Sequence, residues 1–285
     1  MSRILLVRHG QASWGRRDYD VLSARGHEQA RLVGAALAER GVMPDVLVHG
    51  GMRRQRETAE EMVQAAGWSV EPDVDPGWAE YDHMEVITAH RPAYRSMTIM
   101  RADLIRTFQP RRAFHEMYDV ATQRWTGGDH DTDYDESFAQ FSSRVEGALT
   151  TLVARLGARQ TGVVVTSAGV LASIVTDLVH GSSQTWKELE RSAVNAAVTT
   201  LEVTRTGPGL LPLVLGFRTL GLGDTFRAGG ADRLAHPGHA EDRADEAVDA
   251  LLDPRPVAGR GQRCDGRDLV VPFDADEVRP AYRGA

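Results

Sequence analysis

The sequence has almost none of two residue types, cysteine and lysine. Cys264 is the only cysteine in 285 residues, so the chain can form no disulfide within itself. A chain of this length can bury a core without covalent cross-links, and a single cysteine favours a reducing compartment. Lys187 is the only lysine. Any anion site must therefore be built from arginine, histidine and backbone N–H groups.

A long hydrophobic run is also missing from the start of the chain. The first apolar run covers residues 4–7, which is too short for a signal peptide or a membrane span. We therefore expect a cytoplasmic protein with no membrane partner. The net charge of −7 argues against nucleic acid as a partner. An apolar content of 42% and a charged content of 26% are typical of globular proteins.

Strand and helix patterns alternate along most of the chain. Short apolar runs predict strands at 4–7, 45–49 and 163–166, with two more near 197–204 and 211–217. Helical spacing and capping residues predict helices that follow Ser23, span 53–67, run from Phe138 to Leu156 and cover 168–179. This alternation predicts an α/β fold, namely a three-layer α/β/α sandwich with a mostly parallel central sheet.

One segment interrupts the alternation inside the main domain, which we place at 1–227. Residues 82–130 are predicted to form a partly helical, cap-like insertion. Between positions 91 and 124 this insertion has seven arginines and three acidic residues. Two interpretations remain open: the arginines form a solvated helical face, or they cover an anion site.

The last part of the chain differs in composition. Residues 228–285 are rich in Gly, Pro, Asp and Arg, which predicts a C-terminal tail that is partly disordered or lies on the surface, with one short helix at 241–252. His236 and His239 lie in this tail on either side of a Pro-Gly turn. No cysteine or further histidine cluster completes a metal site with them, and we predict no metal.

Basic side chains follow the first two predicted strands. Arg8 and His9 come directly after the first strand, and in an open α/β sheet ligands bind beyond the carboxyl ends of strands. Arg53, Arg54 and Arg56 lie at the start of the next helix, where three positive charges oppose the helix dipole. A phosphate bound there would remove this conflict. The alternative is that these arginines are solvated at the surface.

Six segments, in order along the chain, form a larger pattern. They are "LLVRHGQ" at 5–11, "LSARGHEQA" at 22–30, "MRRQRETAE" at 52–60, Glu80, "DESFAQFSSRV" at 135–145 and "VVVTSAGVLAS" at 163–173. This pattern resembles the histidine phosphatase superfamily, also called phosphoglycerate mutase-like. The third segment parallels that family's Leu-x-Arg-Ala-x-Gln-Thr-Ala-Glu. The resemblance covers roughly residues 1–226.

The resemblance implies a role for each matched residue. His9 would be the nucleophile and carry a phosphohistidine, while Arg8 and Arg54 would hold the phosphoryl oxygens. Glu80 would protonate the leaving group and then act as base on the attacking water. These residue types suit phosphoryl transfer, which depends on positioning and charge neutralisation, and arginine clamps phosphate in bidentate fashion. No metal or other cofactor is needed for this chemistry.

The residues just after the histidine extend the expected site. Gln11 and Ser13 are further candidates for phosphate binding. The expected partner is a small phosphorylated molecule. The apolar strands near 197–217 offer a sheet edge, which makes a homodimer possible.

One departure from the family pattern concerns the end of the later strand. The family normally has Ser-His-Gly-Gly there, whereas this chain has Thr166-Ser167-Ala168-Gly169, so Ser167 stands in place of the second catalytic histidine. A hydroxyl can donate a hydrogen bond to phosphate, but it has no positive charge. Losing one preorganised donor typically costs about 10²–10³ in rate.

Two hypotheses follow from this serine. In the first, the protein is a phosphatase with a serine variant of the pocket, helped by a cation from Arg53, His83 or the arginine-rich insertion. In the second, it is a phosphate-binding or regulatory member with little turnover. We favour the first, because a binding pocket would have no need of Glu80. A mutase is less favoured, because Lys187 lies outside the matching segments and Gly15 replaces an asparagine of the mutases.

Overall fold

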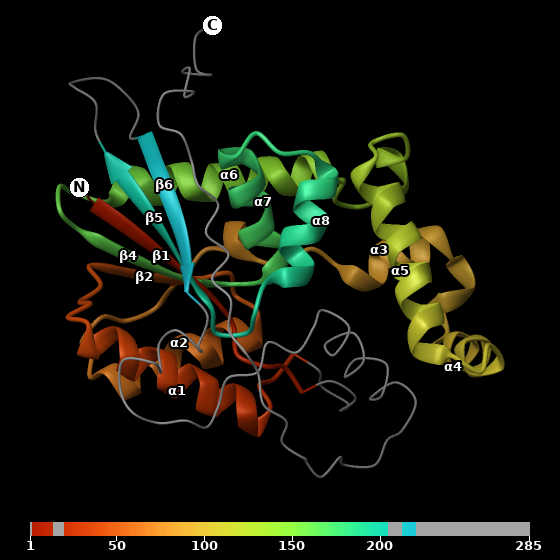
Figure 1. Cartoon of the computed structure of the whole chain (residues 1–285), viewed down its shortest axis with the longest axis horizontal. Helices are drawn as coiled ribbons and strands as arrows, with labels where there is room; N and C mark the ends of the chain where they lie inside the picture. The colour runs from red at the N-terminus through yellow and green to blue at the C-terminus, as the bar shows by residue number, and fades with distance from the viewer. Residues whose placement is uncertain (1, 14–19, 205–212, 221–285) are drawn as a thin grey trace, which may run out of the picture.

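The computed structural model describes residues 2–13, 20–204 and 213–220, and in this part of the chain a six-stranded sheet forms the centre (Figure 1). The strands are β1 (Ser2–Arg8), β2 (Val46–His49), β3 (Asp73–Val74), β4 (Thr161–Thr166), β5 (Val198–Thr204) and β6 (Leu213–Leu220). Their spatial order is β3-β2-β4-β1-β5-β6. The first four are parallel, and β5 is antiparallel to both of its neighbours. The five predicted strands are confirmed, and the two-residue β3 is an addition.

The central strand β1 is buried on both faces. Ile4 and Leu6 pack into the core that contains the α6 and α7 side chains, whereas Leu5 and Val7 pack into the core of α1 and α2. Successive side chains of a strand point to opposite faces, so a strand covered on both sides becomes a continuous apolar run. Helices therefore lie on both faces of the sheet, and the predicted three-layer α/β/α sandwich is confirmed.

The helices of the sandwich are α1 (Ala24–Glu39), α2 (Arg53–Ala66), α6 (Phe138–Arg155), α7 (Ala168–Leu178) and α8 (Ser183–Ser192). Ser23 caps α1 by accepting a hydrogen bond from the Gly26 N–H at 3.0 Å. Ser137 and Gln140 form a capping box at the start of α6. Gly67 ends α2 in the left-handed conformation, with φ at 65°.

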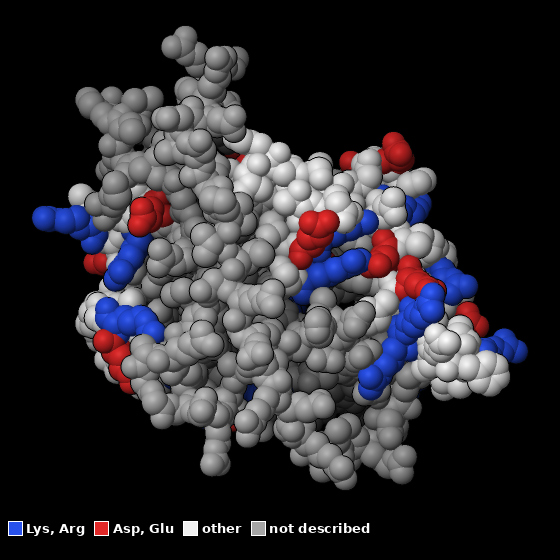
Figure 2. Space-filling view, viewed as in Figure 1, with Lys and Arg blue, Asp and Glu red and all other residues white. Residues whose placement is uncertain are grey.

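Residues 83–126 form a helical lobe beside the sandwich, at the right of Figure 1. It consists of α3 (His83–His90), the 3-10 turn η2 (Pro92–Arg95), α4 (Met97–Arg106) and α5 (Pro110–Thr126). The helical content expected for 82–130 is therefore present. In Figure 2, acidic and basic side chains lie intermixed over this lobe. Several of its arginines are held locally, as Arg112 by Glu116 and Arg124 by Asp133.

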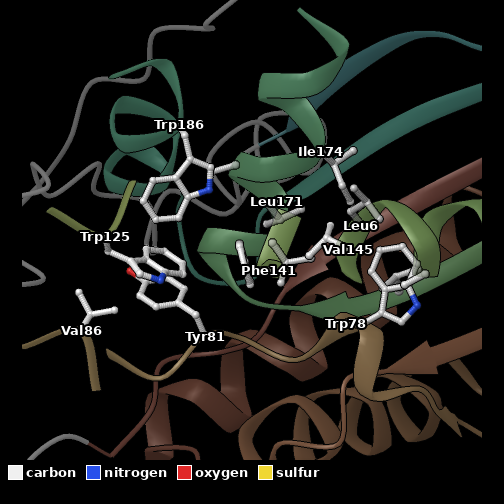
Figure 3. Close-up of a cluster of buried hydrophobic side chains, with 14 of the residues drawn as sticks. Leu6, Trp78, Tyr81, Val86, Trp125, Phe141, Val145, Leu171, Ile174 and Trp186 are labelled. Carbon is white, nitrogen blue, oxygen red and sulfur yellow. The ribbon is translucent and has the colours of Figure 1, made fainter. Parts of the chain in front are cut away.

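An aromatic cluster joins the lobe to the sandwich (Figure 3). Tyr81 stacks on Trp125 of α5 with ring centroids 4.5 Å apart, and Trp186 of α8 and Phe141 of α6 pack against both rings. Trp125 and Trp186 are almost completely buried. Trp78 lies apart from this cluster, near Leu6 of the sheet. The cluster therefore ties three helices and the Tyr81 segment into one core.

Within the part of the chain that the structure describes, no helix has the length and apolar character needed to cross a membrane. The predicted tail at 228–285, its helix at 241–252, and His236 and His239 lie outside the described residues.

The buried position of Trp125 leads to a stability prediction. Trp125→Ala should lower the free energy of unfolding by about 3–5 kcal/mol, because it empties the centre of the aromatic cluster. Urea unfolding monitored by circular dichroism measures this change. Phe108→Ala is the control, since Phe108 is 95% exposed and its loss should cost about 0.5 kcal/mol or less. Equal effects of the two changes would show that the lobe does not share the core of the sandwich.

Candidate active site

The strands β1 and β4 end side by side at the carboxyl edge of the sheet. The two strands are paired in parallel with Arg8 opposite Thr166, so the next residues, His9 and Ser167, leave the sheet at neighbouring points. After β1 the chain continues to α1 on one face, and after β4 it continues to α7 on the other. Chains that diverge in this way open a crevice beyond the strand ends, where ligands bind in α/β sheets.

His9 is held by its backbone and by both ring nitrogens. Its N–H donates to the Thr166 carbonyl at 2.8 Å, and its carbonyl accepts from Asn195 Nδ2 at 3.0 Å. The ring Nδ1 lies 2.7 Å from the Gly10 carbonyl, and Arg54 Nε donates to the ring Nε2 at 3.1 Å. Only the tautomer with the proton on Nδ1 satisfies both contacts. The lone pair is therefore on Nε2.

The electrostatic surroundings keep the His9 ring neutral. His9 is 6% exposed. Burial, followed by the charges of Arg54 and Arg8, lowers the pKa of His9 well below its usual value. A neutral imidazole with a lone pair on Nε2 is a competent nucleophile at neutral pH.

The glycine that follows His9 has a packing role. A Cβ on Gly10 would lie 2.4 Å from the Gly26 carbonyl oxygen of α1, a distance that no side chain tolerates. The Gly10 N–H donates to Thr58 Oγ1 of α2 at 3.0 Å. Glycine at this position therefore lets α1 and α2 approach the turn that holds the histidine.

The three arginines at the start of α2 have different environments. Arg54 is 5% exposed and faces His9, whereas Arg53 and Arg56 are exposed and pair with Glu57 and Glu60 on the same helix. Only Arg54 therefore faces the predicted phosphate site, and the surface interpretation holds for the other two.

An intramolecular anion lies at the start of α2. The Asp20 carboxylate accepts from Arg54 Nη1 at 2.6 Å and from the Arg53 backbone N–H at 2.9 Å. A negative group there compensates both the arginine and the helix dipole. Asp20 therefore supplies the negative charge that the arginines at the start of α2 need, without a bound phosphate.

Arg8 adds a second cation to the crevice. Its Nη1 donates to the Ala193 carbonyl, and its Nε is buried without a partner among the described residues. Burial lowers the pKa of Arg8 to about 10, while the charges of Glu80 and Glu190 act in the opposite direction. The guanidinium is therefore still charged at neutral pH.

Glu80 precedes α3 in the sequence, and its carboxyl group contacts the first turn of α7. The Gly169 N–H donates to its Oε2 at 2.9 Å, and the Tyr81 N–H donates to Oε1 at 3.3 Å. Burial raises the pKa of Glu80, and these hydrogen bonds together with Arg54 partly oppose the rise. The pKa values of His9 and Glu80 are thus shifted in opposite directions.

Ser167 contacts a residue that the sequence did not single out. Gln55 of α2 is completely buried, and its Nε2 donates to Ser167 Oγ at 2.9 Å and to the Trp78 carbonyl at 3.3 Å. The sequence contained one indication of this role: Gln55 stands where the family segment Leu-x-Arg-Ala-x-Gln-Thr-Ala-Glu has alanine. The structure therefore brings His9, Arg54, Glu80 and Ser167 together and adds Gln55.

The remaining predicted phosphate ligands have contacts of their own. Gln11 Oε1 accepts from Ser23 Oγ at 2.9 Å, so this amide supports the start of α1. Ser13 is buried, and its hydroxyl donates to the Leu22 carbonyl at 2.9 Å. Their part in phosphate binding stays a prediction.

The sources suggested for an extra cation differ in charge and position. His83 lies near the arginines, but burial and the charges of Arg54 and Arg8 lower its pKa to about 3, so it is neutral. Arg53 donates to Glu57 at 2.8 Å on the exposed side of α2. In Figure 1, the helix α4, whose sequence includes Arg101 and Arg106, lies at the end of the lobe far from the sheet.

A partly buried polar network adjoins Glu80. Tyr81 Oη donates to Glu190 Oε1 at 2.6 Å and lies 2.6 Å from Tyr118 Oη, and Tyr118 Oη lies 3.4 Å from His83 Nδ1. Burial raises the pKa of Glu190 to about 7. Sequence reasoning missed Glu190 and Tyr118, since neither belongs to a motif and both come from helices distant in the sequence.

Among the described residues, no group of three or more His, Cys, Asp or Glu side chains is arranged to hold a metal ion.

Comparison with known sequences gives one family and several short matches. A sequence model of the family described as "Histidine phosphatase superfamily (branch 1)" matches residues 4–214. A 2,3-bisphosphoglycerate-dependent phosphoglycerate mutase of Mesorhizobium japonicum is 38% identical over 77 residues, which are 24% of this chain and 37% of the relative. Phosphoglycerate mutase 1 of Saccharomyces cerevisiae is 38% identical over 72 residues, 23% and 29% of the two chains. The chain thus matches about a third of these relatives' length.

Solved structures support the fold. The structure named "Mycobacterial hydrolase 2" superposes on this protein with a TM-score of 0.51 at 20% sequence identity. The match covers 76% of this chain and 88% of the hydrolase chain. A phosphoserine phosphatase of Entamoeba histolytica, in complex with 3-phosphoglyceric acid, has a TM-score of 0.50 at 17% identity, covering 76% and 96%. At these identities the likeness establishes the architecture alone.

The contact between α7 and Glu80 predicts a cost for one added methyl group. In Gly169→Ala the new Cβ would lie 2.4 Å from Glu80 Oε1 and 2.8 Å from the Tyr81 ring. We expect a loss of about 1–3 kcal/mol in the free energy of unfolding, measured in urea. Gly147→Ala is the matched control, because its Cβ meets no atom within 4 Å. It should be neutral or stabilising by up to about 1 kcal/mol. Equal effects at both glycines would contradict the close contact.

The raised pKa of Glu190 predicts a pH-dependent stability. Between about pH 4.5 and 7 the folded protein keeps a proton on Glu190 that the unfolded chain releases. Stability of the wild type should therefore fall, relative to Glu190→Gln, as the pH rises through this window. Urea unfolding at several pH values measures the difference, with Glu188→Gln on the exposed side of α8 as control. A difference that does not vary with pH would refute the assignment.

Proposed function

Because the chain belongs to the histidine phosphatase superfamily, we propose that it is a metal-independent phosphomonoesterase that acts through a phosphohistidine on His9. The observation that carries the proposal is the state of the His9 ring. It is a buried, neutral imidazole whose Nε2 lone pair lies at the Arg54 guanidinium. A histidine with only a structural role would have no need of its acceptor nitrogen beside a buried cation.

The first step transfers the phosphoryl group to the histidine. On substrate binding, a phosphoryl oxygen replaces His9 Nε2 as the acceptor of the Arg54 Nε–H, which frees the Nε2 lone pair. His9 Nε2 then attacks phosphorus in line with the ester oxygen, the N–P bond forms, and the P–O ester bond breaks. Glu80 gives its proton to the departing oxygen, so the alcohol leaves neutral. The raised pKa of Glu80 keeps that proton available at higher pH than an exposed carboxyl would.

The second step reverses these roles. The Glu80 carboxylate removes a proton from water, the oxygen attacks phosphorus, and the N–P bond breaks to return a neutral His9. Arg8 and Arg54 neutralise the phosphoryl oxygens in both steps, so the protein itself supplies the positive charge. For Arg54 this requires exchange of the Asp20 carboxylate for phosphate, or a shared contact with both.

The proposed substrate is a small anionic phosphomonoester. The helical lobe would act as a cap over its leaving group. The support for this is Tyr118 of α5, which bonds to Tyr81 beside Glu80 and so brings the lobe to the edge of the crevice. We thus propose that the domain at 1–227 binds the substrate and that its insertion at 82–130 covers the leaving group.

The second candidate is a phosphate-ligand-binding or regulatory protein with little turnover. The neutral Ser167 favours it, because the pocket then has one positive charge fewer than the family pattern provides. Mutase activity is the third candidate, and the short matches to mutases are its support.

A homodimer is a separate proposal. In the described part of the chain β6 is the outermost strand on its side of the sheet, where a second copy would add its own edge.

The nucleophile assignment predicts the effect of one substitution. His9→Ala should reduce hydrolysis of p-nitrophenyl phosphate, assayed from pH 4 to 8, by about 10³-fold or more. Mass spectrometry of the wild-type protein mixed with substrate should detect a phosphoryl group on His9. His130→Ala is the control, because His130 is exposed and pairs with Asp133. Full activity of His9→Ala would overturn the mechanism. Vanadate binding without turnover by the wild type would favour the regulatory alternative.

A further inference from the structure

Two departures from the family segments, 112 residues apart in the sequence, touch each other in the fold. Gln55 stands where the family segment Leu-x-Arg-Ala-x-Gln-Thr-Ala-Glu has alanine, and Ser167 stands where the later strand normally ends in histidine. Gln55 is larger than the alanine, and Ser167 is smaller than the histidine. The glutamine therefore fills space that the shorter serine leaves open, which keeps this wall of the crevice close-packed.

The hydrogen bonds of Gln55 show which end of the amide is used. Its Nε2 donates to Ser167 Oγ and to the Trp78 carbonyl, whereas its Oε1 is buried without a partner among the described residues. Buried polar atoms are normally hydrogen-bonded, so an unpaired acceptor in a fully buried side chain calls for an explanation. The described contacts of the amide are therefore made by its NH₂ group, which donates to Ser167.

The hydroxyl of Ser167 is free to serve a ligand. A serine before the first turn of a helix usually accepts a bond from a backbone N–H of that turn. Ser167 makes no such bond, because the Gly169 N–H donates to Glu80 instead. Ser167 Oγ accepts from Gln55, and its own proton has no acceptor among the described residues. Ser167 is 1% exposed, so bulk water does not take that proton.

We propose that Gln55 and Ser167 form a composite unit that replaces the missing histidine: Gln55 orients Ser167, and the Ser167 hydroxyl donates to a phosphoryl oxygen on or near His9. The inference rests on the proposed function and adds to it. Ser167 is the residue that touches phosphate, and Gln55 is a positioning residue. The unit is neutral, so this wall of the pocket carries no charge that titrates near neutral pH.

The test is a double-mutant cycle on the full-length chain. Ser167→His alone should lower kcat for p-nitrophenyl phosphate at least tenfold, because Gln55 occupies the space that the ring needs. Gln55→Ala alone should also lower kcat about tenfold, because Ser167 loses its support. The double variant Gln55→Ala/Ser167→His should recover activity to within a few fold of the wild type. Its pH profile between 5 and 8 should also gain one further ionisation relative to the wild type, from the new imidazole.

The control cycle combines Gln55→Ala with Ser173→Ala, a buried serine of α7 outside the crevice. Its two effects should multiply without recovery, as expected for sites that do not interact. Gln55→Glu keeps the shape of the side chain but presents an acceptor to Ser167, so it should lose activity at a temperature at which circular dichroism shows the variant to be folded. This variant keeps the test valid if Ser167→His fails to fold.

The outcomes separate the two proposals. An active wild type with multiplicative losses in the Gln55/Ser167 cycle would refute the composite unit and leave the phosphatase intact. If the wild type shows no turnover, the cycle is measured by binding of inorganic phosphate and vanadate. Recovery of binding in the double variant would support the unit while the phosphatase proposal fails. Absence of binding in the wild type would refute both.

Discussion

The parallel pairing of β1 with β4 is the constraint on which the rest of the structure depends. It places Arg8 opposite Thr166 and joins the His9 N–H to the Thr166 carbonyl at 2.8 Å. Both strands are buried on two faces, so neither can shift by one residue without moving apolar side chains into the wrong layer. The positions of His9 and Ser167 at the edge of the sheet are therefore fixed by core packing.

The crevice holds two cations, Arg8 and Arg54, close to the carboxyl groups of Glu80 and Asp20. Burial lowers the pKa of His9 and raises that of Glu80, whose hydrogen bonds and neighbouring arginines partly oppose the rise. Arg54 is compensated by Asp20, and Arg8 by the nearby carboxyl groups. A phosphate dianion entering this site meets positive charge that is already oriented, once it takes the place of the Asp20 carboxylate on Arg54 or shares that contact.

The aromatic cluster and the tyrosine pair connect this chemistry to the helical lobe. Tyr81 follows Glu80 directly, stacks on Trp125 of α5, and shares its hydroxyl with Tyr118 and Glu190. A displacement of the lobe would therefore move Tyr81 and disturb its neighbour Glu80. This connection gives the insertion a physical route to influence the site without supplying a charged residue to it.

The order of elements, the α/β architecture and the residues of the family motifs followed from the sequence, because each depends on local patterns: apolar runs of four residues, helical spacing and capping residues. The tertiary structure alone decided which of the three arginines at 53, 54 and 56 faces the site, since that depends on the rotation of α2 against α1. It also decided that Asp20 neutralises Arg54, that Gln55 contacts Ser167 and that Glu190 approaches Glu80. These pairs are separated by tens to more than a hundred residues in the sequence, and only the packing of α2, α7 and α8 around one sheet edge brings them within hydrogen-bonding or electrostatic range.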